Sequence, residues 1–307
     1  MLVEEELTAI KPEGDTALTV GVFDGVHRGH QSLIARLNQK ATAEGLVSTV
    51  VTFKHHPRLV LKPQSHITRL TSLQERITLL ERVGVRYVVP LSFTPDLSQL
   101  SAGEFAALLS RHLRMRSLLI GPDFALGKGK RGDAEALAAL GEELNFTVEV
   151  APPMVLNGEV VSSTAIRNAL AEGDIGKANA FLGRYFSLTG QVSQGDSRGK
   201  TLGFPTANIV PQHGQALPAD GVYAVRVYVG DTAYNAVANI GLRPTFGSEE
   251  RLLETYLLDF SGDLYGQEIR VEFIDRLRDE IRFPDAEELK NQMARDVEQA
   301  GELLGQS

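Results

Sequence analysis

The sequence predicts an α/β protein of two domains: a doubly wound parallel sheet, then a small antiparallel β-barrel with a C-terminal helix. Its 307 residues favour two domains over one. Strand and helix patterns alternate through the first half, which is typical of a parallel sheet covered by helices. Beyond residue 184, short alternating strands separated by turns replace the helical pattern and indicate a small barrel.

The first half holds five apolar strand candidates. Helices are predicted between them where apolar residues recur three and four positions apart. The strands are predicted at residues 18–23, 47–53, 87–91, 117–120 and 147–150, and the helices at 31–44, 73–83, 102–111, 134–144, 165–172 and 174–182.

The second half is predicted to be an antiparallel barrel. Gly- and Asp-rich turns separate its short strands, and an amphipathic helix at residues 285–304 ends the chain. We place the domain boundary after residue 184, which gives domains 1–184 and 185–307. The strands are predicted at residues 186–192, 222–229, 232–239, 253–260 and 268–273.

The composition narrows the function. A net charge of −8 argues against a broad nucleic-acid surface, although local basic clusters can still bind a phosphorylated small molecule. The absence of cysteine excludes disulfides, Cys-ligated zinc and a thiol nucleophile. The acidic N-terminus lacks a signal-peptide core, and no apolar run is long enough to span a membrane. We therefore expect a cytoplasmic protein with neither nucleic-acid nor membrane partners, and leave the oligomeric state open.

The segment Gly21–Gln31 is the most informative part of the chain, because it joins a predicted strand to a predicted helix. Phosphates bind at the carboxyl ends of parallel strands and at helix N-termini. Gly25 and Gly29 permit close approach of a ligand, and His27 and His30 can donate hydrogen bonds to it. Such donors stabilise the charge that develops when the α-phosphate of ATP is attacked. The alternative is a structural N-cap with two surface histidines.

Residues 21–30, which read Gly-Val-Phe-Asp-Gly-Val-His-Arg-Gly-His, resemble the first motif of FMN adenylyltransferases of the HxGH nucleotidylyltransferase superfamily. From about Thr16 onwards the chain resembles bacterial bifunctional riboflavin kinase/FAD synthetases. The resemblance implies an HxGH domain followed by a flavokinase domain. It implies catalytic roles for His27 and His30, and ATP contacts from Gly21, Phe23, Asp24, Gly25 and Gly29.

Two other segments of the first domain resemble parts of the family's site. His56 matches a family histidine and is expected to line the ATP or the flavin pocket, with flavin contact the prediction carried forward, although His55 stands where the family has proline. The loop 121–133 is rich in glycine and cations, so Lys128 is expected to contact phosphate and Asp123 the flavin. The alternative for this loop is a solvated connection to a helix capped by Asp133.

Residues 161–167 resemble the family's Ser-Ser-Thr-x-Ile-Arg motif. Ser163 and Thr164 offer hydroxyls at a helix start, and Arg167 offers a forked cation one turn later. The resemblance implies that they hold the β- and γ-phosphates of ATP. Without it, such a sequence usually only caps a helix.

Residues 199–208 resemble the flavokinase signature. Their glycines suit a loop that folds over phosphates, and the neutral oxygens of Thr206 and Asn208 suit Mg²⁺. The loop is not a Walker A motif, because Gln194 stands where its first glycine would be. Phosphate contacts are expected from Gly199, Lys200, Thr201 and Gly203.

Glu254 matches the family glutamate taken as general base on the ribityl 5′-hydroxyl of the flavin. Tyr256 stands where the family has histidine, which leaves the role of that position open. Residues 239–247 resemble another family loop, in which glycine and proline predict a turn. Asn239 and Arg243 are expected to contact the flavin there.

The resemblance implies two reactions in one chain. ATP would phosphorylate riboflavin to FMN, and a second ATP would adenylylate FMN to FAD and release pyrophosphate, with Mg²⁺ in both steps. One alternative is adenylylation or cytidylylation of another phosphate, which the flavokinase signature disfavours. The other is a flavin-binding regulator without catalysis, which the intact His27, His30 and Glu254 disfavour.

Overall fold

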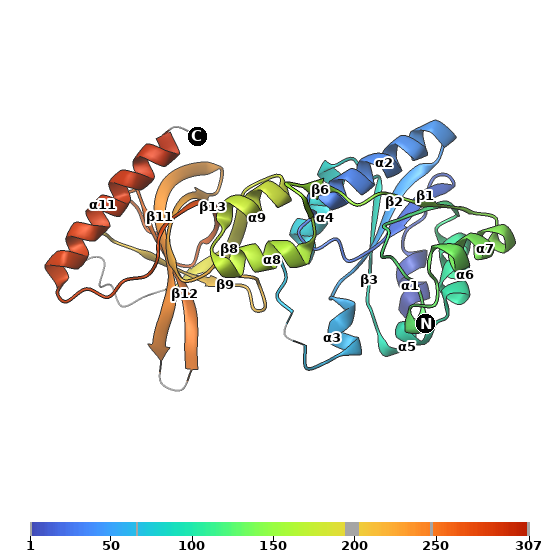
Figure 1. Ribbon diagram of the computed structural model, residues 1–307, viewed down its shortest axis with the longest axis horizontal. Helices are drawn as coiled ribbons and strands as arrows, with labels where there is room; N and C mark the ends of the chain where they lie inside the picture. Colours follow the sequence, from blue (N-terminus) through green and yellow to red (C-terminus); the bar gives the residue numbers. More distant parts are fainter. Residues whose placement is uncertain (1, 66, 194–202, 246–247, 306–307) are drawn as a thin grey trace. The chain divides into compact units, whose positions relative to one another are not determined.

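The computed structural model describes residues 2–65, 67–193, 203–245 and 248–305 (Figure 1). The chain divides into two compact units, Met1–Ser163 and Thr164–Ser307. This division falls at the start of the two short helices that precede the barrel. The domain boundary predicted after residue 184 stays a prediction.

The first unit is built on a five-stranded sheet in the order β3-β2-β1-β4-β5, and every neighbouring pair is parallel. β1 lies between β2 and β4, where the strand order reverses, and its carboxyl end is therefore a switch point at which ligands bind. The strands are β1 (Thr16–Val20), β2 (Val47–Phe53), β3 (Tyr87–Leu91), β4 (Met115–Ile120) and β5 (Thr147–Val150).

Helices cover both faces of this sheet, which confirms the predicted doubly wound fold (Figure 1). α2 (Arg28–Glu44) and α4 (Leu73–Arg82) pack on one face through apolar side chains that include Ile34 and Leu80. α1 (Leu2–Thr8), α6 (Ala102–His112) and α7 (Ala134–Leu144) pack on the other. Each fully buried leucine or isoleucine contributes about 1.5–3 kcal/mol.

The boundaries differ from prediction mainly at the first turn. β1 ends at Val20 instead of residue 23, and α2 begins at Arg28 instead of residue 31, because the histidine that precedes Arg28 caps the helix. Several short elements have too few residues to show a periodic pattern. They are α3 (Pro57–Leu61), α5 (Pro95–Gln99), the 3₁₀ turn η1 (Lys128–Lys130), β6 (Val155–Leu156) and β7 (Glu159–Val160).

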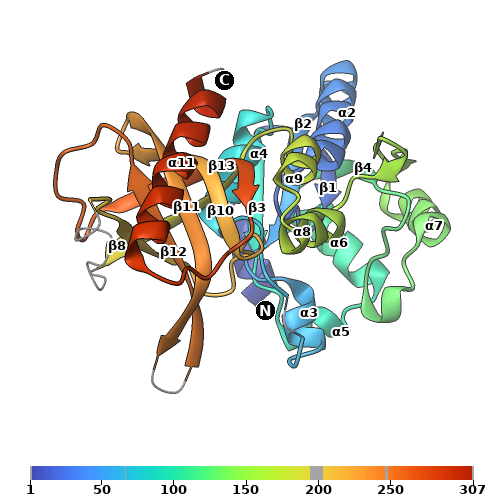
Figure 2. The same ribbon diagram turned by 60° about the vertical axis from the view of Figure 1, so that its left-hand side comes forward.

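The second unit is a closed antiparallel barrel in the order β10-β11-β12-β9-β8-β13, which confirms the predicted barrel (Figure 2). The sequence did not predict β9, because its first two residues end the segment that was expected to be a phosphate loop. The strands are β8 (Phe186–Ser193), β9 (Ala207–Pro211), β10 (Gly221–Val229), β11 (Thr232–Thr245), β12 (Ser248–Leu257) and β13 (Glu268–Arg278).

The turn predicted at residues 239–247 is wrong for most of its length. β11 continues to Thr245 and pairs with β12 from Gly241↔Leu252 to Thr245↔Ser248. The ladder hydrogen bonds of this long hairpin outweigh the turn preference of glycine and proline in the segment.

Three helices pack on the barrel. The Asn179 side chain of α9 (Ile175–Leu182) donates to Phe273 O at 2.9 Å and accepts from Phe186 N at 2.7 Å. α11 (Ala286–Gly305), the predicted C-terminal helix, is labelled in Figure 2. A partly buried Arg278–Asp296 ion pair ties it to β13. The Leu170 carbonyl of α8 (Ser163–Glu172) accepts a hydrogen bond from Ala219 N, just before β10, at 2.8 Å. Within the described residues, no helix combines the length and apolarity needed to cross a membrane.

Candidate active sites

The turn between β1 and α2 has a constrained backbone. Phe23 and Val26 have φ angles of 52° and 38°, and Gly25 has 81°. Positive φ is uncommon for any residue with a side chain and rarer still for a β-branched valine. Each such residue costs about 1–3 kcal/mol, which the surrounding contacts must offset, and backbone of this kind concentrates at functional sites.

The two histidines lie side by side at the start of α2. The Nδ1 atom of His27, the N-cap residue, accepts a hydrogen bond from His30 N at 3.4 Å. The rings are stacked, with centroids 3.6 Å apart and planes 20° apart. A Cβ at Gly29 would lie 3.1 Å from the His27 ring and from Val161 O, so a side chain here would push on the His27 ring. The sequence prediction of paired histidines at a helix start therefore matches the geometry.

His30 is held in its neutral form. Burial lowers its pKa well below 6.5, and the nearby His27 and Arg76 charges lower it further. Its Nδ1 atom is buried and has no hydrogen-bond partner in the described part of the chain. The Phe23 ring packs against it edge-on, with centroids 5.0 Å apart. At neutral pH the stacked pair therefore presents a neutral imidazole with an uncommitted nitrogen.

The lowered pKa of His30 predicts acid sensitivity of the first unit. In the unfolded chain His30 takes up a proton near pH 6.5, whereas in the folded state its lowered pKa opposes protonation. The free energy of unfolding is therefore fully present above pH 6.5 and decreases as the pH falls below that value. Between about pH 7.5 and 5.5 the free energy of unfolding is expected to fall by up to about 1.4 kcal/mol for this reason.

Denaturant unfolding at both pH values measures this loss of stability. His30→Gln is expected to lose less stability than the parent, whereas a variant of the exposed His55 should match the parent; equal losses in all three would contradict the assignment.

Asp24, predicted to contact ATP, is engaged within the protein. Its carboxylate accepts hydrogen bonds from Leu70 N at 2.9 Å and Thr71 N at 3.2 Å. Its carbonyl oxygen accepts from the Ser163 hydroxyl at 2.8 Å. The structure therefore brings Ser163 to the histidine turn and gives the Asp24 side chain a role in shaping that turn; the predicted phosphate contact of Ser163 stays a prediction. Thr164 and Arg167 lie in α8 in the second unit.

Sequence reasoning missed two side chains that hold the carbonyl of Val22, just before the turn. The Thr52 hydroxyl donates to Val22 O at 3.0 Å, and Nη1 of Arg76 donates to the same oxygen. Arg76 is only 5% exposed. A signal was available, because Arg76 falls on the same helix face as the buried Leu80 and interrupts an apolar stripe.

The basic loop is anchored through its backbone. Leu126 and Gly132 exchange two N–H···O bonds of 2.9 and 3.0 Å, and Lys128 N donates to Leu100 O at 2.8 Å. A Cβ at Gly127 would lie 2.3 Å from Ala102 N, so this position requires glycine. The Lys128 side chain is exposed. Its predicted phosphate contact stays a prediction.

The two residues predicted to contact flavin in the first unit lie on irregular or short elements. His56 is the N-cap of α3, and its Nδ1 accepts from Arg58 N at 3.1 Å. Asp123 is exposed in the loop after β4. The flavin contacts of both residues stay predictions.

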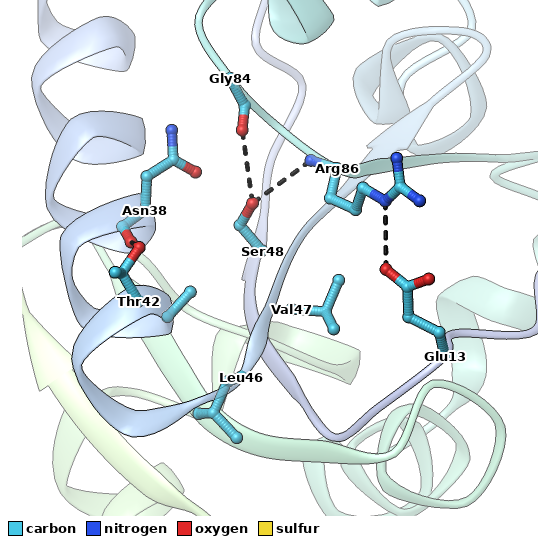
Figure 3. Close-up of a pocket in the computed structure, with 9 residues that line it drawn as sticks. Glu13, Asn38, Thr42, Leu46, Val47, Ser48, Gly84 and Arg86 are labelled. Carbon is cyan, nitrogen blue, oxygen red and sulfur yellow. Dashed lines mark hydrogen bonds and ion pairs between the residues drawn. The ribbon is translucent and has the colours of Figure 1, made fainter.

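A cavity of about 310 Å³ lies at the opposite edge of the sheet (Figure 3). Its lining comes from the end of α2, the start of β2 and the residues just before β3. Within it, the hydroxyl oxygen of Ser48 accepts a hydrogen bond from Arg86 N at 3.2 Å. Parallel sheets bind ligands at the carboxyl ends of their strands, so this cavity is separate from the histidine site.

In the barrel, three predicted site residues form one row across adjacent strands. Glu254 of β12 pairs in register with Asn208 of β9 on one side and with Asn239 of β11 on the other. Residues directly opposite in antiparallel strands have Cβ atoms about 4.5–5.5 Å apart on one face. Because Leu253 and Thr255 are fully buried, the row lies on the outer face of the barrel. The sequence predicted these residues separately, and strand pairing brings them together.

Asn208 stands out in this row because it is 6% exposed and its Oδ1 atom is buried without a hydrogen-bond partner among the residues that the structure describes. A buried amide oxygen is costly unless it is hydrogen-bonded or bound to a cation. Thr206, the other predicted magnesium ligand, is partly buried two residues earlier.

Tyr256 lies two residues after Glu254, on the same face of β12. Its ring contacts Phe204 edge-on, with centroids 5.3 Å apart. Gly203 has a φ of 88°, which favours glycine at this predicted loop position. Gly199, Lys200 and Thr201 lie outside the described residues, and so does the side chain of Arg243.

Two protein-family models match successive parts of the chain. The family model described as FAD synthetase matches residues 9–165, and that described as riboflavin kinase matches residues 182–304. The bifunctional riboflavin kinase/FMN adenylyltransferase of Escherichia coli (strain K12) is 40% identical over 296 residues, which covers 96% of this chain and 94% of the relative. That of Haemophilus influenzae is 40% identical, with 92% of each chain covered.

A solved structure gives the same extent of similarity. The crystal structure described as a macrolide-efflux protein from Streptococcus pneumoniae superimposes with a TM-score of 0.90 at 32% identity. The match covers 97% of this chain and 96% of that one, so both units have counterparts in it.

Proposed function

Because this chain belongs to the bifunctional riboflavin kinase/FMN adenylyltransferase family, it phosphorylates riboflavin to FMN and adenylylates FMN to FAD, and we propose which of its residues carry each step. The histidine turn of the first unit serves adenylyl transfer. The Asn208–Glu254–Asn239 row of the barrel serves phosphorylation. The observation that carries the proposal is this row, in which strand register places a carboxylate between two amides.

In adenylyl transfer, a phosphate oxygen of FMN attacks the α-phosphorus of ATP and pyrophosphate leaves. The FMN phosphate is largely ionised at neutral pH, so no protein base is needed. His27 and His30 donate hydrogen bonds to the phosphate oxygens on which charge develops. Their stacking and the close packing of Gly29 support this role, because the donors are held in place before substrate binds.

In phosphorylation, Glu254 accepts the proton of the ribityl 5′-hydroxyl as that oxygen attacks the γ-phosphorus of ATP and ADP leaves. The neighbouring Asn239 offers a neutral hydrogen-bonding group to the flavin. The partial burial of Glu254 and its place between two amides support an oriented carboxylate.

Mg²⁺ fits the donor chemistry of Thr206 and Asn208. The buried Oδ1 atom of Asn208 is the kind of neutral oxygen that Mg²⁺ accepts alongside phosphate and water. When bound, the ion would neutralise charge on the transferred phosphate. The described residues hold no cluster of three or more His, Cys, Asp or Glu side chains suited to a metal, so phosphate and neutral oxygens would supply the ligands.

The remaining assignments complete the proposal. His56, Asp123 and Arg243 contact the flavin. A cytoplasmic location, expected from the N-terminal sequence, is part of the proposal and is compatible with the ATP that both reactions consume. The Asp24 carboxylate shapes the turn through Leu70 and Thr71. The other contacts to ATP or its phosphates come from Gly21, Phe23, Gly25, Gly29, Lys128, Ser163, Thr164, Arg167, Gly199, Lys200, Thr201 and Gly203.

A chromatographic time course of the protein with riboflavin, ATP and Mg²⁺ tests the two-step scheme. FMN is expected to rise first and then give way to FAD. FMN alone would contradict the role of the histidine turn, and FAD formed only from added FMN would contradict the role of the barrel row. Stoichiometric flavin binding without ATP turnover would instead support a regulator.

The Asn208 assignment makes a separate prediction. In Asn208→Ala, the Mg²⁺ concentration that gives half-maximal FMN formation is expected to rise by about tenfold, because a ligand oxygen is lost. Asn291→Ala, on the exposed surface of α11, is the control and should leave the requirement unchanged. Titration of both variants with Mg²⁺ at saturating ATP checks this. An unchanged requirement in Asn208→Ala would remove Asn208 from the metal site.

A further inference from the structure

The histidine turn is held by a segment distant in sequence that makes no predicted substrate contact. This segment, Leu70–Arg76, comprises the residues before α4 and its first turn. Because Phe23 and Val26 have positive φ angles, the turn needs outside contacts to keep its shape. The contacts of segment 70–76 show where that support comes from.

Thr71 and Leu70 hold the histidine turn through hydrogen bonds to Asp24 and Gly25. The backbone N–H groups of both residues donate to the Asp24 carboxylate, as does the Thr71 hydroxyl, at 3.4 Å. In return, Thr71 Oγ1 accepts from Gly25 N at 3.1 Å. Thr71 and Leu70 are each 2% exposed. Water therefore cannot readily replace these bonds.

Arg76 adds a buried cation on the same side. Its Nη1 donates to Val22 O, and its Nε is buried with no partner in the described ranges. Burying an incompletely paired guanidinium costs several kcal/mol, so apolar packing alone would favour leucine here. Burial lowers the pKa of Arg76 and the Arg69 charge adds to this effect, while the Asp24 charge partly opposes it. Packing energy alone therefore does not account for an arginine at this position.

We propose that Arg76 and Thr71 are positioning residues for adenylyl transfer: they lock the end of β1 and the Asp24–Gly25 step so that the stacked histidines meet the α-phosphate of ATP. This inference rests on the proposed role of His27 and His30. Because Arg76 lies under the turn and Thr71 binds its backbone, neither needs to touch substrate. Their loss misplaces the histidines without removing them, which lowers kcat more than it raises KM.

Riboflavin phosphorylation by the barrel measures how much active protein each preparation holds, and denaturant unfolding shows whether the first unit of each variant is folded. Arg76→Met is expected to lower kcat for FAD formation from FMN by about 10- to 100-fold, with a smaller change in KM for ATP. Arg76→Lys should recover part of that loss, because it keeps the charge. Arg82→Met, on the exposed end of α4, is the matched control and should behave as the parent.

A second pair covers the case in which Arg76→Met does not fold. Thr71→Val removes the hydroxyl at nearly constant volume, and Thr71→Ser restores it. We expect Thr71→Val to lower kcat for FAD formation and Thr71→Ser to restore it. A parent-like kcat in folded Arg76→Met would overturn the inference, and if that variant does not fold, a parent-like kcat in Thr71→Val would do so. In either case a defective His30→Ala variant would show that the proposed site itself still stands. Parent-like kcat in His30→Ala would overturn the proposed site itself.

Discussion

Glu254→Gln is expected to abolish FMN formation while FMN supplied directly still becomes FAD. Removal of a general base typically costs about 10²- to 10⁴-fold in rate. The amide keeps the size of the side chain and its place between Asn208 and Asn239, so the strand register should survive. What it loses is the ability to accept the proton of the attacking hydroxyl.

The measurement is the rate of each step by chromatography, with riboflavin or FMN as the starting flavin. Glu268→Gln is the matched control, since Glu268 is an exposed glutamate at the start of β13, a barrel strand that does not pair with β12. It should phosphorylate riboflavin like the parent. A Glu254→Gln variant that does so too would reject Glu254 as the base.

His30→Ala is expected to have the opposite effect: FAD formation falls by about 10²- to 10³-fold, as when an oxyanion donor is removed, while FMN formation stays near the parent rate. The deletion also removes the ring on which His27 is stacked. Both donors are therefore disturbed by one change, which is why a large effect is expected from this position.

Single-turnover assays from FMN and steady-state assays from riboflavin separate the two activities of this variant. His213→Ala, which alters an exposed histidine, is the control and should retain both. Loss of both activities in a folded His30→Ala protein would contradict the division of work between the two units. Retention of FAD formation would remove His30 from the reaction.

Local patterns in the sequence predicted much of the architecture. The apolar run Thr16–Val20 is buried along its whole length, and the histidine turn follows it as expected. The spacing of apolar residues placed α2, α4 and α11 within a few residues of their observed ends. These features depend on neighbours three or four residues apart, which is the range over which helix and strand preferences act.

Other features depended on residues far apart in the chain. β9 has few residues and follows a glycine-rich segment, so only its pairing with β8 and β12 makes it a strand. The same pairing decides that Asn208 lies opposite Glu254, a relation no local spacing reveals.

The sequence by itself determined the fold class, the histidine turn and the candidate residues for the chemistry, because each depends on contiguous patterns. Only the tertiary structure decided how those residues are held. Asp24 is bound by backbone groups of Leu70 and Thr71, and Val22 by Arg76, across 46 to 54 positions of chain. A carboxylate, a carbonyl and a buried guanidinium can each take many partners, and the packing of α4 against the sheet selects the ones that they bind.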